Sequence, residues 1–103
     1  IVFTGETAAP GAWKGLVFQS TSPNNQLSYV DLNYGGSSSY TGATQKRANL
    51  HVGAWSAGAV TIDNMTISNS AAWGIWVSAN SNDINVPPTV TYSNNASGNY
   101  YKE

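Results

Sequence analysis

The chain has 103 residues, of which only 9% are charged, and its formal net charge is −1. This length fits one domain, or part of one, near the small end for an all-β fold. Its four basic residues form no cluster beyond Lys46 and Arg47, which excludes the positive surface of a nucleic-acid-binding or anionic-membrane-binding protein, and the lack of cysteine excludes disulfides and cysteine-ligated metals.

The first strand-like segment is at residues 1–3, where two apolar residues lie two positions apart. The same spacing recurs in two later pairs, Leu32 with Tyr34 and Met65 with Ile67. We therefore expect the chain to begin in the last strand of a coil, whose open end is covered by further chain or by another copy. The start at Ile1 also suggests that a leader or upstream region has been removed.

Short strands separated by polar loops follow. Gly15–Phe18 is expected to be a strand with Leu16 and Phe18 on one face, and residues 49–52 and 74–77 repeat it at offsets of 34 and 25. Residues 35–47 form the largest insertion, and residues 78–88 form a second long polar loop. No stretch has the 3.6-residue apolar spacing of a helix, so the sequence predicts an all-β fold.

The ten residues from Val60 to Asn69 are the central unit of the pattern. They are interpreted as two short strands joined at Asn64, and they overlay residues 27–36 at an offset of 33. In that alignment Asn64 falls on Asp31, and both are residue types that tolerate a left-handed corner. The alignment predicts three rows of stacked side chains, namely Leu16–Leu50–Ile75, Phe18–Val52–Val77 and Leu27–Val60–Val90.

Four features together resemble a known family: Trp13-Lys14-Gly15-Leu16, Trp73-Gly74-Ile75, the unit at 60–69, and Asn94-Asn95. They are similar to those of right-handed parallel β-helix proteins of the pectate-lyase-like superfold, especially the non-catalytic repeat regions of bacterial secreted and surface proteins. The resemblance implies an all-β, right-handed parallel β-helix (β-solenoid) of about three coils, a fragment of a longer solenoid. We expect one domain, 1–103, with coils at about 1–14 (partial), 15–47, 48–73 and 74–103. An antiparallel β-sandwich is the alternative fold, although the sequence has no Asn-Gly or Asp-Gly hairpin turn.

The acidic residues are too dispersed to predict a catalytic or metal site. The resemblance implies that enzymes of this superfold use clustered acidic residues for calcium with a basic residue, or paired Asp carboxylates. Here no two acidic residues lie close in sequence, and Asp31 is assigned to a corner. The loop at 80–83 offers a single carboxylate, which is little for calcium. We therefore predict no catalytic residues, no metal and no cofactor.

The candidate ligand-binding residues are aromatic, namely His51, Trp76, Trp55 and Trp73. His51 lies between two inward residues, so it should face outward in a stripe with Val17 and Trp76. It is then either a surface residue packed on its neighbours or, with Trp76, a place where a sugar ring stacks and forms a hydrogen bond. The other tryptophans either plug the coil ends or provide further carbohydrate platforms.

The function expected from these observations is a non-enzymatic structural or glycan-binding segment of a secreted or cell-surface bacterial protein. The expected partners are a polysaccharide or other glycan, and further copies of the chain joined end to end, with no nucleic acid and no membrane insertion. The alternative is a fragment of a polysaccharide lyase or glycoside hydrolase whose catalytic residues lie outside this chain. A longer sequence with clustered Asp and a Lys or Arg on adjacent coils would favour the enzyme.

Overall fold

The computed structural model describes residues 1–40, 46–53 and 59–103. All regular structure in these residues is β-strand, as the sequence predicts, and none of them lies in a helix that could span a membrane. The strands are β1 (Val2–Phe3), β2 (Leu16–Phe18), β3 (Gln26–Asn33), β4 (Ala48–Val52), β5 (Thr61–Ser68), β6 (Trp73–Val77), β7 (Val90–Ser93) and β8 (Gly98–Lys102).

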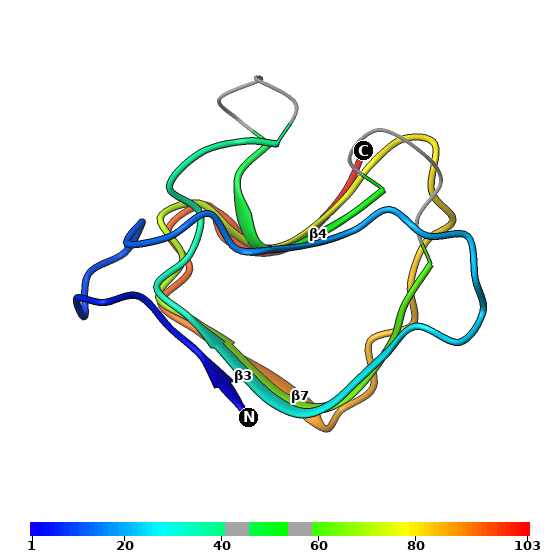
Figure 1. Cartoon of the computed structure of the whole chain (residues 1–103), viewed down its shortest axis with the longest axis horizontal. Coiled ribbons are helices and arrows are strands. Elements are labelled where there is room, and N and C mark those ends of the chain that lie inside the picture. Colours follow the sequence, from blue (N-terminus) through cyan, green and yellow to red (C-terminus); the bar gives the residue numbers. More distant parts are fainter. Residues whose placement is uncertain (41–45, 54–58) are drawn as a thin grey trace.

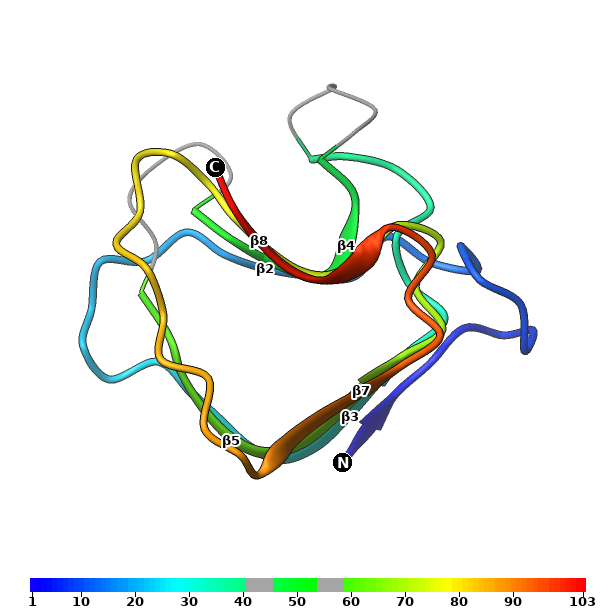
Figure 2. The same ribbon diagram turned by 180° about the vertical axis from the view of Figure 1, so that it is seen from behind.

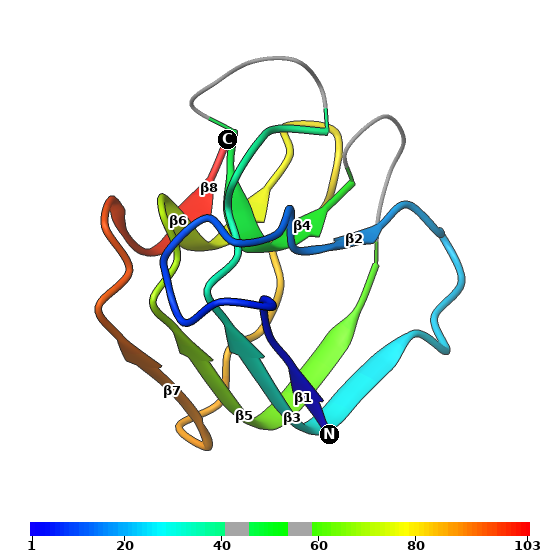
Figure 3. The ribbon, with the colours of Figure 1, turned by 60° about the vertical axis from the view of Figure 1, so that its left-hand side comes forward.

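The strands form two parallel sheets between which the chain alternates. The first sheet has the order β1-β3-β5-β7 and the second has the order β2-β4-β6-β8. Viewed down the shortest axis, the strands of each sheet lie over one another (Figure 1), and the view turned by 60° separates them into a side-by-side series (Figure 3). Between two neighbouring strands of one sheet, the chain therefore passes once through the other sheet.

The second sheet has the register predicted from the sequence. Leu16 pairs with Leu50 and Leu50 with Ile75, while Phe18, Val52 and Val77 form the adjacent row. The final strand extends these rows with Tyr100 and Lys102. The residues of β4 are all buried, as are four of the five in β6, because one side of this sheet faces the core and loops cover part of the other.

The register predicted for the first sheet is wrong. Leu27 pairs with Ile62, not with Val60, and Val90 pairs with Met65, so the offsets are 35 and 25. The predicted row Leu27–Val60–Val90 does not form.

The shift arises at the corner within β3. Tyr29 has the left-handed backbone there (φ 56°), and its counterpart in β5 is Asn64 (φ 47°). Asp31, which the sequence assigns to this corner, is instead an exposed strand residue between Val2 and Thr66. A left-handed tyrosine costs on the order of 1 kcal/mol or more and is uncommon, whereas Asp tolerates this backbone, so the residue type favours the wrong corner.

A second corner ends the strands of the first sheet. It is formed by Tyr34 (φ 62°), Asn69 (φ 53°) and Asn94 (φ 54°), which follow the last residues of β3, β5 and β7. The amide of Asn69 donates to the carbonyl of Ser93, 2.9 Å away, so the parallel hydrogen bonding continues through the corner. Tyr34 is therefore a corner residue and not the inward counterpart of Ile67 that the sequence alignment suggests.

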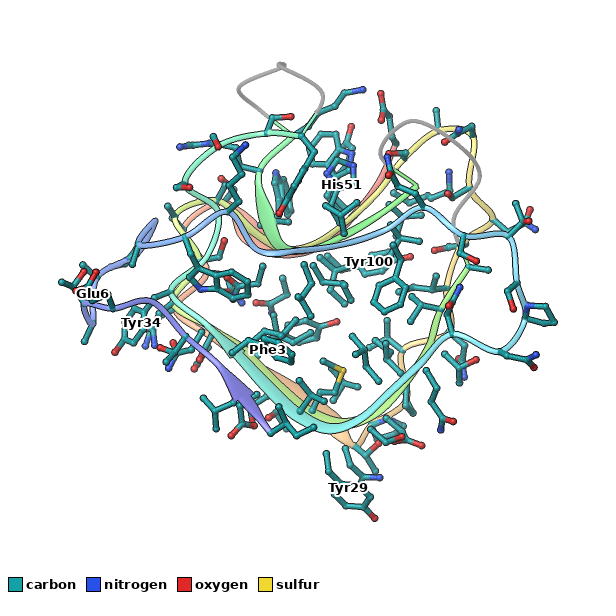
Figure 4. All side chains as sticks on the ribbon, viewed as in Figure 1. Phe3, Glu6, Tyr29, Tyr34, His51 and Tyr100 are labelled. Atoms are coloured by element: carbon teal, nitrogen blue, oxygen red, sulfur yellow. The ribbon has the colours of Figure 1, made fainter. Side chains whose placement is uncertain are left out.

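The core lies between the two sheets. Phe3 and Tyr100 point into this space, whereas Tyr29 and Glu6 point away from it (Figure 4). The buried apolar residues of the core are Val30, Leu32, Leu50, Val52, Ile62, Met65, Ile67, Ile75, Val77 and Val90. Apolar rows from both sheets thus meet in one continuous core, which supplies the main stabilisation of the fold.

Asn49 joins the sheets through a buried amide that the sequence analysis does not single out. Its Oδ1 accepts a hydrogen bond from the backbone N–H of Gly35 (2.7 Å), and its Nδ2 donates to the carbonyls of Leu32 (3.2 Å) and Ser68 (2.8 Å). Asn49 is 0% exposed, so these bonds replace the water that the three backbone groups lose on folding. The side chain of Asn95 makes similar bonds near the end of β5 in the first sheet: it accepts from the N–H of Ser70 and donates to the carbonyl of Ile67.

Candidate functional site

The predicted outward row of the second sheet exists, but two of its members are covered. Val17 pairs with His51, His51 with Trp76, and Trp76 with Tyr101. His51 is only 1% exposed and Trp76 only 5% exposed, so the expectation that they lie open on the surface is wrong. The ring of Tyr40 lies edge-on to His51 at 6.5 Å between centroids, and Tyr101 stacks on Trp76. Figure 2 shows β8, which carries Tyr101, over the preceding strands of this sheet.

Three rings on β6 and β8 form what we call the aromatic cluster, namely Trp73, Trp76 and Tyr101. The rings of Trp76 and Tyr101 are stacked with centroids 4.4 Å apart, and Trp73 lies 5.1 Å from Tyr101 and 6.4 Å from Trp76. Tyr101 is 40% exposed and Trp73 is half-buried. The parallel register places Trp76 beside Tyr101, and the ring contacts of Trp73 add it to the cluster. Tyr101 is the ring most open to a ligand.

Polar and charged groups adjoin the aromatic cluster. The indole N–H of Trp76 donates to Oε2 of Glu103 (3.4 Å), while Oε1 of Glu103 forms an ion pair with Lys46 Nζ at 2.6 Å. The hydrogen bond from Lys46 lowers the pKa of Glu103, so this carboxylate stays ionised at neutral pH. Both side chains are partly exposed, and an ion pair of this kind stabilises a fold by at most about 1 kcal/mol. Its main effect is to hold Trp76 and the end of the chain together.

His51 is a neutral, buried imidazole. Its Nε2 lies 3.0 Å from Oγ of Ser78, and its Nδ1 has no hydrogen-bond partner among the described residues. Burial is the main cause that lowers the pKa of His51 to about 4, and the positive charge of Lys46 adds to it, while Glu103 acts in the opposite direction. His51 therefore has its ring against Ser78 and Tyr40 and is not available to hydrogen-bond a sugar.

The titration of His51 predicts a specific loss of stability in mild acid. Because the pKa is about 6.5 in the unfolded chain and about 4 in the folded chain, the unfolded state binds a proton first as the pH falls. The stability associated with the neutral ring is complete above about pH 6.5 and is lost progressively towards pH 4, by about 2–3 kcal/mol.

Urea denaturation at pH 7.0, 5.5 and 4.5 measures this loss, with His51→Gln as the matched control. The glutamine side chain of this variant does not titrate, whereas Glu103, Lys46 and the other ionisable groups are unchanged, so the difference between the two proteins isolates His51. The free energy of unfolding of the wild type should fall more steeply than that of His51→Gln between pH 6.5 and 4.5. Parallel pH profiles would show that the ring is not buried as described.

The structure separates the predicted tryptophans. Trp73 and Trp76 meet in the aromatic cluster, whereas Trp55 lies outside the described residues. Trp13 lies elsewhere, stacked on Phe3 at 6.4 Å, and its Nε1 donates to the carbonyl of Asn33. The sequence analysis did not single out Tyr101 as a candidate. The signal was present, since Tyr101 follows Trp76 by the same 25 residues that separate Trp76 from His51.

The acidic residues form no metal-binding group in the described part of the chain. Within it, no three His, Asp or Glu side chains are close enough together to hold a metal ion. The carboxylate of Asp83, from the predicted loop at 80–83, accepts hydrogen bonds from the hydroxyl of Tyr100 and the backbone of Ile84. Burial, together with this hydrogen bond, raises the pKa of Tyr100 to about 12. Asp83 therefore anchors its loop to the second sheet.

Comparison with protein-family models, curated proteins and solved structures finds no match for this chain. No pocket is found among residues 1–40, 46–53 and 59–103. The aromatic cluster is accordingly the group of side chains in this part of the chain best suited to contact a ligand at the surface.

Proposed function

We propose that the chain is a non-enzymatic segment of a right-handed parallel β-helix, secreted or displayed at a bacterial cell surface, and that its aromatic cluster binds a glycan. The alternation of the chain between two parallel sheets supports the β-helix, and parallel crossovers are almost always right-handed. The surface is rich in hydroxyl and amide groups and poor in charge, which is the composition expected of such a protein.

The observation that carries the binding proposal is the exposed ring of Tyr101 supported by buried Trp76. A sugar presents a face of C–H groups that packs on a flat aromatic ring, and its hydroxyls need polar partners at the edge. The ring of Trp76, on the neighbouring strand, stacks on the ring of Tyr101 with centroids 4.4 Å apart, and Trp73 extends the apolar surface beside it. Because the platform is already ordered before binding, little conformational entropy is lost when a ligand stacks on it.

Polar side chains near this platform supply the hydrogen-bonding edge. Lys46 and Glu103 are paired within reach of the indole of Trp76. In this arrangement Tyr101 contacts the sugar directly, Trp73 contacts it at one side, and Trp76 positions Tyr101. His51 lies next to Trp76 in the same row of the second sheet and does not contact the sugar.

A glycan-array screen followed by calorimetric titration of the best glycan tests the proposal. Wild-type protein should bind, Tyr101→Phe should retain most of the affinity because the stacking ring remains, and Tyr101→Ala should bind at least about tenfold more weakly, which is about 1.4 kcal/mol. Tyr29→Asn is the matched control, since it removes another exposed tyrosine on the first sheet, at a corner where Asn64 shows that asparagine fits. Absence of binding by the wild type, or unchanged affinity in Tyr101→Ala, would contradict the proposal.

A further inference from the structure

The two sheets end together at each end of the stack. We call β1 and β2 the leading edge, and β7 and β8 the trailing edge, because each of these strands has one neighbour in its sheet. Large apolar side chains are exposed on the leading edge, where Ile1 is 81%, Val2 61% and Phe3 36% exposed. Open strand edges with apolar side chains are sites at which a further strand adds.

The backbone groups directed outward on the leading edge follow from the parallel pairing. The amide of Asp31 donates to the carbonyl of Ile1, and the amide of Gly53 donates to that of Phe18. Successive residues of a strand direct their N–H and C=O groups to opposite sides. Val2 in β1 and Val17 in β2 therefore direct their backbone groups away from β3 and β4, towards the open side.

The trailing edge has the complementary groups. The carbonyls of Thr89 and Ser93 accept from β5 and its corner, so the C=O of Val90 and the N–H of Tyr92 are directed to the open side of β7. The amide of Glu103 donates to Val77, so the C=O of Tyr100 and the N–H of Lys102 are directed to the open side of β8.

If a second copy is shifted along the stack axis, its β1 can pair with β7 and its β2 with β8 at the same time. It would place Val2 of a second copy beside Thr91, in the row of Asp31 and Thr66, and Val17 beside Tyr101, in the row of His51 and Trp76. The N–H and C=O of Val2 would then lie between the C=O of Val90 and the N–H of Tyr92. The second copy would thus continue each sheet with the same parallel pairing that joins successive strands within one copy.

The apolar rows of the core continue across this junction. Phe3 is in the row of Leu32, Ile67 and Tyr92, and Leu16 is in the row that ends at Tyr100. The residues at the ends of these rows are exposed or half-buried, whereas those in the middle are fully buried. Contact between the two edges would bury them against one another.

The end face is comparable in outline with an interface of standard size. The molecule measures 33 × 30 Å across the stack, an elliptical outline of about 780 Å² that includes the loops around the two sheets, and each partner of a standard interface buries roughly 800 Å².

We propose that a second copy of this chain docks on the leading edge through its own trailing edge, forming a head-to-tail parallel stack. The contact is heterologous and does not close, so each added copy leaves another open edge for the next. The inference concerns the strand edges and does not rest on glycan binding. A second copy that places Val17 beside Tyr101 would cover part of the ring proposed to contact the glycan, so docking and glycan binding should compete.

Sedimentation equilibrium over a range of concentrations tests this docking. The wild-type mass should rise above the 10.9 kDa of one chain as the concentration increases. Val2→Pro removes one outward N–H at the junction while leaving the hydrogen bonds of Ile1 to β3 in place, and it should weaken association at least about tenfold. Val2→Ala is the matched control, because it keeps the backbone donor and should still associate. A wild type that stays at 10.9 kDa, or a Val2→Pro protein that associates as the wild type does, would overturn the proposal.

A mixture of two blocked variants tests the head-to-tail direction. Lys102→Pro removes an outward N–H of the trailing edge, so this variant and Val2→Pro should each be mainly monomeric at concentrations where the wild type associates. Mixed in equal amounts, they should form a dimer, because each retains one intact, complementary edge. A mixture that remains monomeric would overturn the head-to-tail arrangement. Far-UV circular dichroism of each variant confirms that the fold is retained before the masses are compared.

Discussion

Replacement of Ile62 by Asp is expected to leave the chain unfolded at 25 °C. Ile62 is 2% exposed and pairs with Leu27 inside the stack of apolar rows. The substitution removes a buried aliphatic side chain and places a carboxyl group where the core offers apolar neighbours, a combined loss of at least about 5 kcal/mol. This is comparable with the whole stability of a small domain, so the variant should lack the far-UV circular dichroism of a β-sheet and a cooperative melting transition.

Thr61→Asp is the matched control for this prediction. Thr61 precedes Ile62 in the same strand, but its side chain is exposed on the opposite face. It introduces the same carboxyl group in water, and it should keep the fold with a change of about 1 kcal/mol or less. If Thr61→Asp unfolds and Ile62→Asp does not, then Thr61 faces the core and Ile62 faces the solvent, which contradicts the structure.

Replacement of Asn49 by Ala is expected to reduce the free energy of unfolding by about 3–5 kcal/mol, because three buried backbone groups lose their partner. These groups are the N–H of Gly35 and the carbonyls of Leu32 and Ser68. Asn49→Asp should be similarly harmful, since a carboxylate can accept from Gly35 but cannot donate to the two carbonyls. Urea denaturation at pH 7 measures both changes.

Asn95→Ala is the comparison that identifies burial as the cause. Asn95 makes analogous bonds, to the N–H of Ser70 and the carbonyl of Ile67, but it is only half-buried, so water can replace its amide. The loss should therefore be smaller, about 1–2 kcal/mol. Equal losses at positions 49 and 95 would show that the number of bonds, and not their burial, sets the effect.

Three strands of the second sheet, β2, β4 and β6, could be predicted from the sequence because their inward and outward residues alternate from Leu16 to Phe18, Leu50 to Val52 and Ile75 to Val77. Leu50 and Val52 on either side of His51 repeat the pattern of Leu16 and Phe18, so the register follows from the period of two. The same alternation placed Trp76 beside His51. The alternation of residues predicts on which face of the sheet a side chain lies, but not which other residues cover that face. For this reason the burial of His51 by Tyr40 and of Trp76 by Tyr101 could not be predicted.

The first sheet could not be predicted because its corner residues conflict with local preference. Tyr29 and Tyr34 adopt the left-handed backbone that their neighbours Asn64 and Asn69 adopt more readily. An alignment that treats tyrosine as an inward apolar residue slips by two positions and still matches apolar residues with apolar residues. Only the pairing across the sheet, which depends on contacts distant in sequence, distinguishes an offset of 35 from an offset of 33.

This difference can be measured directly on the wild-type protein by NMR, and it is the sharpest test of the stacked parallel arrangement. Nuclear Overhauser contacts between the backbones of Asp31 and Thr66, and of Thr66 and Thr91, are expected from the register of the first sheet. Contacts between Asn33 and Thr66 in place of those from Asp31 would support the offset of 33, and antiparallel contacts between sequential strands would contradict the arrangement altogether.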